Sequence, residues 1–96
     1  MKLLMVICPP DRVEGVREVI RGHGVHAYSE LESVTGEGET GLKLGTHVWP
    51  ERSALLFTAV SDQKGKDLAA ALREFRSGLY PGEGLKIFSL PVEEEI

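Results

Sequence analysis

Short apolar runs along the chain predict buried strands. Residues 2–8 (KLLMVIC) form a continuous apolar run that stops at Pro9-Pro10. Residues 53–60 (SALLFTAV) form a second such run, and residues 85–90 (LKIFSL) form a third. Runs of this length that are rich in branched side chains are typical of strands buried in a sheet rather than of helices. We therefore expect three strands at these places.

A fourth strand is predicted where apolar and polar residues alternate. In residues 25–34 (VHAYSELESV), Val25 and Leu31 fall on one side of the alternation, and Glu30 and Glu32 fall on the other. Such alternation is typical of a half-exposed strand. We expect the two glutamates to lie on its solvated side.

Two segments have the spacing of amphipathic helices. Apolar side chains in residues 13–20 recur at intervals of three and four. Asp11 precedes them and can cap the helix, and Gly22 or Gly24 can end it. A second apolar stripe runs from residue 68 to residue 79. It follows the capping segment Ser61-Asp62-Gln63.

The order of these elements indicates the fold. Strand, helix, strand, strand, helix and strand, joined by right-handed crossovers, predict an α+β, ferredoxin-like βαββαβ sandwich. In this fold a four-stranded antiparallel sheet carries two helices on one face. The expected organisation is one domain, residues 1–96, with a long loop at 35–52 between the second and third strands.

Composition excludes several classes of function. The net charge of −4 lacks the basic footprint of a nucleic-acid-binding domain. Cys8 is the one cysteine, which excludes an internal disulfide. No apolar run is long enough to cross a membrane, and the N-terminal run lacks the cleavage site of a signal peptide. We therefore expect a cytoplasmic protein without direct membrane insertion.

The loop at 35–52 is much longer than an ordinary hairpin connection. It is rich in glycine and glutamate, and it contains Lys43, His47 and Trp49, the last being the single tryptophan. One interpretation is a solvated loop that hides Trp49 against a neighbouring subunit. The other is a recognition loop that becomes ordered on a partner, with these three residues as its contacts.

Two short segments are candidates for binding an anion. Gly36-Glu37-Gly38 can form a backbone nest that directs N–H groups at an anion. Lys64, Gly65 and Lys66 lie at the start of the second predicted helix, where a phosphate can bind. The alternative for the second segment is an ordinary helix cap with solvated lysines.

Taken together, three features resemble the PII-like family, the nitrogen regulatory P-II proteins. They are the element order, the long loop opened by Gly36-Glu37-Gly38 and the short glycine- and lysine-bearing segment Asp62–Lys66 before the second helix. The resemblance implies a non-enzymatic signalling protein that forms a homotrimer. It implies that an adenine nucleotide, ATP, ADP or AMP, binds between subunits, and that the long loop reports on it to a transporter or an enzyme. It also implies that Gly36, Gly38, Lys64, Gly65 and Lys66 are the positions that contact phosphate.

Two other functions stay open on the residues alone. Cys8, His23, His26 and His47 could bind Zn²⁺ or Cu⁺, as in a CutA-like metal-tolerance trimer, although their spacing matches no standard metal motif. The second function is that of a small enzyme using Tyr28, Glu30 or Glu32, but the chain has none of the common catalytic motifs. We therefore expect no metal site and no catalytic residue.

Overall fold

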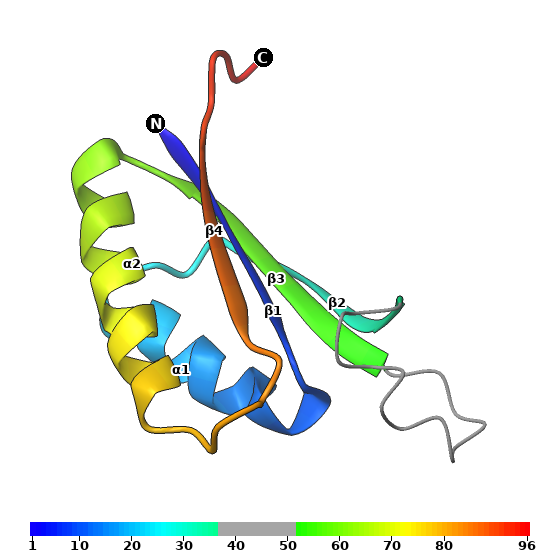
Figure 1. Cartoon of the computed structure of the whole chain (residues 1–96). Coiled ribbons are helices and arrows are strands. Elements are labelled where there is room, and N and C mark those ends of the chain that lie inside the picture. Colours follow the sequence, from blue (N-terminus) through cyan, green and yellow to red (C-terminus); the bar gives the residue numbers. More distant parts are fainter. Residues whose placement is uncertain (37–51) are drawn as a thin grey trace.

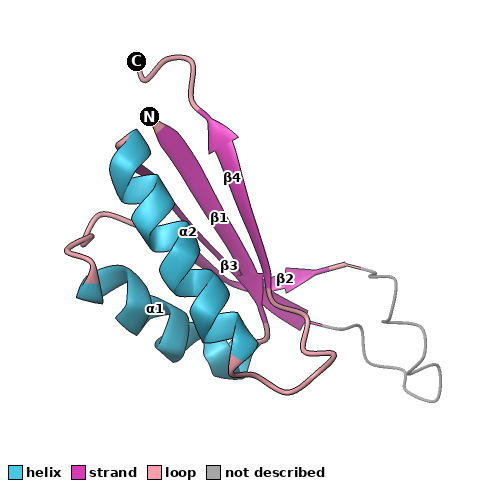
Figure 2. Ribbon diagram, turned by 60° about the vertical axis from the view of Figure 1, so that its left-hand side comes forward, coloured by secondary structure: helices cyan, strands magenta, loops and turns pink. Residues whose placement is uncertain are grey.

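The computed structural model describes residues 1–36 and 52–96. Four strands form one antiparallel sheet in the order β2-β3-β1-β4, and the two α-helices lie side by side on one face of it (Figures 1 and 2). This confirms the predicted ferredoxin-like fold. The elements are β1 (Lys2–Cys8), the 3₁₀ turn η1 (Pro10–Arg12), α1 (Val13–Gly22), β2 (Ser29–Thr35), β3 (Arg52–Val60), α2 (Asp62–Ser77) and β4 (Lys86–Pro91).

The hydrophobic core lies between the helices and the sheet. Because successive side chains of a strand point to opposite faces, every second residue of β1 and β3 faces the helices. The apolar stripes of α1 and α2 pack onto these residues. The fully buried larger side chains are Leu4, Val6, Cys8, Val16, Ile20, Leu56, Leu68 and Leu72.

The other side of the sheet is also apolar. Met5 of β1 pairs with Phe57 of β3 and with Phe88 of β4, and Leu55 pairs with Leu31 of β2. We call this surface the open face; its apolar residues are Leu3, Met5, Ile7, Leu31, Leu55, Phe57, Ala59, Phe88 and Leu90. Leu31 and Phe88 remain 53% and 46% exposed. A contiguous apolar surface of this kind marks an interaction site.

Strand β2 differs from the prediction in its start and in its orientation. It begins at Ser29, not at Val25, and before the ladder starts the Ala27 carbonyl accepts a 2.7 Å hydrogen bond from the Thr58 hydroxyl. Glu30, expected on the solvated side, faces the helices. Leu31 lies on the open face instead. The expectation failed because it took the apolar side of the alternation for the core side, whereas this sheet is apolar on both faces.

The helix caps were predicted correctly for α2 but not for α1. The Ser61 hydroxyl accepts a 3.2 Å hydrogen bond from the Lys64 N–H, as expected of an N-cap. Asp11 caps nothing with its side chain; it lies in η1, and Arg12 precedes the first residue of α1. Pro10 starts the 3₁₀ turn because its fixed φ angle suits a first helical position.

Candidate functional site

The candidate residues occupy two opposite ends of the sheet. Strand β3 runs about 26 Å between them, at about 3.3 Å per residue. At the loop end, β2 leads into Gly36 and the α2–β4 connection (78–85) approaches η1 (Figure 1). At the terminal end, the start of α2 lies beside the N-terminus of the chain.

The structure separates the residues that the sequence singled out for phosphate. Gly36 is exposed at the loop end, whereas Lys64–Lys66 lie at the terminal end. Within one chain these two segments do not meet, so any shared site requires a second protomer. The remaining predicted contacts lie outside the described residues: Gly38, Lys43, His47 and Trp49.

Two of the predicted phosphate contacts have roles in the fold. The Lys64 ammonium donates a 2.6 Å hydrogen bond to the His23 carbonyl and so caps the C-terminal end of α1. Gly65 is buried where α2 crosses β1; a β-carbon there would lie 3.1 Å from the β-carbon of Lys2. Lys66 is exposed beside them. It is the member of this segment whose side chain is directed to solvent.

A second glycine segment, missed in the sequence analysis, lies at the loop end. Residues 80–85, which we call the glycine turn, connect α2 to β4 and contain Gly82-Glu83-Gly84. Gly82 has a φ of +88°, which other residues rarely adopt. The sequence did contain a signal, because the tripeptide Gly-Glu-Gly occurs both at 36–38 and at 82–84.

An ion pair fastens the glycine turn to the β1–α1 connection. The Arg12 guanidinium donates two hydrogen bonds to the Glu83 carboxylate, at 2.7 and 3.0 Å. The Tyr80 N–H donates a third, at 2.9 Å. The Arg12 hydrogen bonds, together with that from Tyr80, hold the pKa of Glu83 below its usual range. The carboxylate therefore stays ionised, and the Arg12 guanidinium balances its negative charge.

Two more cations lie at the loop end. Arg52, the first residue of β3, donates a 3.0 Å hydrogen bond to the Ser33 hydroxyl. Lys86, the first residue of β4, directly follows the glycine turn and is exposed. Arg52 therefore lies near the β2 edge of the loop end, whereas Arg12 and Lys86 lie near the glycine turn on the β4 edge. The acidic groups Asp11, Glu32 and Glu83 lie at the same end.

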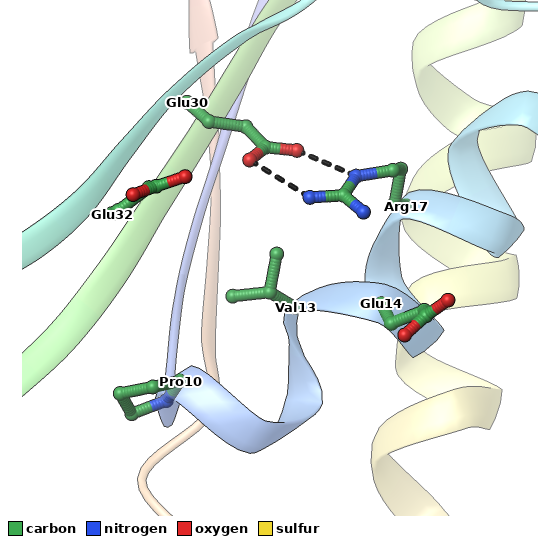
Figure 3. A pocket seen from close by; sticks show the side chains of 6 residues that line it. All are labelled: Pro10, Val13, Glu14, Arg17, Glu30 and Glu32. Carbon is green, nitrogen blue, oxygen red and sulfur yellow. Dashed lines mark hydrogen bonds and ion pairs between the residues drawn. The ribbon is translucent and has the colours of Figure 1, made fainter.

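A hollow of about 290 Å³ lies between α1 and β2 (Figure 3). The Arg17 guanidinium reaches from α1 to the Glu30 carboxylate on β2, with hydrogen bonds of 2.8 and 3.0 Å. These bonds lower the pKa of Glu30. The hollow is lined by Pro10, Val13, Glu14, Arg17, Glu30 and Glu32. Its best-defined feature is the link between α1 and the strand that leads to Gly36.

Neutralising Glu30 is expected to remove a pH-dependent part of the stability. Because the pKa of Glu30 is lowered from an ordinary value of 4.5, its pairing with Arg17 stabilises the fold above that pH and is lost as the pH falls below it. In urea unfolding, Glu30→Gln should be less stable than the wild type at pH 7. The difference should shrink towards pH 3; a constant difference would contradict the assignment.

The metal-binding alternative gains no support from the described part of the chain. There, no three histidine, cysteine, aspartate or glutamate side chains gather as ligands. Burial raises the pKa of the Cys8 thiol to about 11, which disfavours the thiolate that metals bind. The His23 ring nitrogen Nδ1 lies 3.0 Å from the Val19 carbonyl.

Neither described helix is long and apolar enough to span a lipid bilayer.

Comparison with known proteins identifies the family. The family described as nitrogen regulatory protein P-II matches residues 1–96. A GlnB-like protein 1 of the nitrogen fixation nifHD region, from Methanothermococcus thermolithotrophicus, is 28% identical over 95 residues, which are 98% of this chain and 90% of the relative. CPII from Thiomonas intermedia K12, solved with ADP and bicarbonate, superimposes with a TM-score of 0.70 at 19% identity, covering 93% of this chain and 82% of CPII. The resemblance inferred from the sequence is confirmed: the chain belongs to the nitrogen regulatory P-II family and is a signalling protein of that family.

Proposed function

We propose that this protein is a homotrimeric regulator that binds an adenine nucleotide between its subunits and controls a protein partner through the loop at 35–52. The observation that carries the proposal is that several candidate groups lie at one end of the sheet, the loop end. There Gly36, where β2 leads into that loop, lies at the same end as the glycine turn and the cation Lys86. Since β2 and β4 are the opposite edge strands of the sheet, a ligand held between the β4 edge of one protomer and the β2 edge of the next would contact the base of the loop directly.

The open face supports the trimer. It presents nine apolar side chains on one side of the sheet, among them Phe57 at its centre and Phe88 and Leu90 on β4. An isolated protomer would leave them in water. Packing three sheets together would bury these side chains and protect the edge strands β2 and β4. It would also bring residues of one protomer to the loop end of the next.

The glycine segments support a phosphate-binding role. Glycine lets the backbone approach an anion closely, and consecutive N–H groups can then donate to it. Gly36, Gly38 and the glycine turn are the proposed backbone donors, and Lys86 is the proposed cation. Lys66 is a second candidate cation, supplied from the start of α2 of a neighbouring protomer; Lys64 and Gly65 would support that segment. CPII, which shares this fold, was solved with ADP.

The loop itself is the proposed contact with the partner, through Lys43, His47 and Trp49. Tryptophan is among the residues that most often anchor a protein interface. A transporter or an enzyme is the kind of partner that this signalling role would serve. Because the chain has a single tryptophan, the fluorescence of Trp49 would report on the loop without a label.

Nucleotide binding is expected to raise the thermal midpoint of the protein. A ligand at one hundred times its dissociation constant stabilises the native state by about 2.7 kcal/mol. For a domain of this size that corresponds to a shift of about 10 °C or more. We would measure unfolding with and without millimolar ATP, ADP and AMP, and record Trp49 emission in parallel. No shift with any of the three nucleotides would overturn the proposed function.

Charge reversal at the two candidate lysines decides where the phosphates bind. Lys86→Glu is expected to abolish most of the nucleotide-dependent shift, because it places a negative charge beside the glycine turn. Lys66→Glu makes the same charge change at the opposite end of the sheet and is expected to have the smaller effect. A larger loss with Lys66→Glu would move the site to the start of α2.

A further inference from the structure

We infer that Arg12 is a positioning residue for the nucleotide: it neutralises Glu83, so that the glycine turn can accept a phosphate group. The inference rests on the proposed function, and it assigns to Arg12 the charge balance that lets the glycine turn bind phosphate. Glu83 stands between two glycines whose N–H groups are the proposed donors. An uncompensated carboxylate at that position would repel the anion that the turn is proposed to bind.

The geometry gives Arg12 this role. Arg12 lies in η1, directly after β1, the strand that pairs with β4. It stands 71 positions before Glu83 in the sequence, and its guanidinium pairs with both oxygens of the carboxylate. Such bidentate pairing fixes direction as well as distance. Glu83 also shapes the turn through its backbone: its N–H donates to the Tyr80 carbonyl at 3.2 Å, and its carbonyl accepts from Leu85 at 2.9 Å.

The Arg12–Glu83 pair is shielded enough from water for the Glu83 charge to affect a bound ligand. The side chains of Arg12 and Glu83 are 30% and 19% exposed, which is less than is usual for a surface ion pair. Solvent therefore screens the Glu83 charge incompletely if Arg12 is removed. Arg52 and Lys86 are exposed at the same end, but within the described residues neither donates a hydrogen bond to Glu83. Arg12 is its cationic partner there.

The expected nucleotide affinity of one double variant differs according to whether Arg12 compensates charge or only supports the structure of the turn. In Glu83→Gln the amide oxygen can still accept the Tyr80 N–H, so the turn keeps its own hydrogen bond while the charge disappears. If Arg12 acts by compensating charge, removing both charges restores binding. If Arg12 only holds the turn in place, the double variant stays as weak as Arg12→Met.

The test is titration calorimetry of the full chain with AMP, ADP and ATP. Arg12→Met is expected to weaken ADP binding by at least about tenfold, and the loss should grow from AMP to ATP because the repulsion increases with ligand charge. Arg12→Met/Glu83→Gln is expected to recover most of the lost affinity. Thermal midpoints without ligand show whether each variant is folded.

Arg17→Met is the matched control. It removes a bidentate arginine–glutamate pair of the same geometry, which joins α1 to β2 and has no hydrogen bond to the glycine turn among the described residues. It should leave ADP affinity within about twofold of the wild type. Unchanged affinity in Arg12→Met, or a double variant without recovery, would overturn the inference while the wild type still binds. A wild type that binds no nucleotide would instead overturn the proposed function, and the inference with it.

Discussion

Replacing Phe57 with glutamate is expected to convert the proposed trimer into single protomers. Phe57 lies at the centre of the open face, paired with Met5 on β1 and with Ser29 on β2. In a trimer a glutamate there would be buried in an apolar interior without a partner, which costs several kcal/mol in each subunit. In a free protomer the same side chain would reach water. We would measure the mass in solution, expecting one chain of 10.5 kDa rather than three.

The control for this change is Ile96→Glu, which adds the same charge at a fully exposed position. It should leave the mass of the assembly unchanged. If Phe57→Glu also keeps the mass of the wild type, the open face is not the interface. If the protomers separate and the nucleotide-dependent shift disappears with them, the nucleotide site requires two subunits, as the proposed function states.

The fold could be predicted from the sequence because its strongest patterns are local. The apolar run of β1 is bounded by a charged residue and two prolines, and the predicted range Lys2–Cys8 matches the strand. The cap of α2 could be predicted for the same reason, since a serine hydroxyl needs only a backbone N–H three residues later. Element order and crossover handedness then leave few arrangements of four strands and two helices.

The faces of β2 could not be predicted because they depend on distant partners. Glu30 faces the helices, where Arg17 of α1 pairs with it, and Leu31 faces outward beside Leu55 on the open face. An alternating pattern gives two faces but does not state which one meets the core. In a sheet that is apolar on both sides, the ordinary assumption fails.

The candidate site was harder still to predict. The Arg12–Glu83 pair joins residues far apart in the sequence, and nothing local to the Gly82–Gly84 tripeptide shows that it lies near η1. For Lys64 the local sequence suggested a binding site that the structure does not support. Its position at a helix start suggested an anion site, yet its ammonium is directed at the His23 carbonyl. Composition identifies which residues can bind phosphate, but only packing shows which of them the fold already uses.

Truncating Leu68 to alanine is expected to have the largest effect on the stability of the protomer. Leu68 is 0% exposed, on the face of α2 that packs against the sheet. Its loss should lower the free energy of unfolding by about 2–5 kcal/mol, through lost burial and the cavity left behind. That is a large part of the roughly 5–15 kcal/mol typical of a domain.

The measurement is urea unfolding at one fixed protomer concentration, because association would otherwise change the apparent stability. Leu68→Met keeps the volume and apolar character of the side chain and should cost less than about 1.5 kcal/mol. A difference between the two variants would show that the cavity, rather than any change at this position, destabilises the protein. If Leu68→Ala lost no more than Leu68→Met, α2 would not be packed on the sheet as described. The start of α2, with Lys64 and Lys66, would then lose its fixed position as well, because the same packing holds that segment against β1.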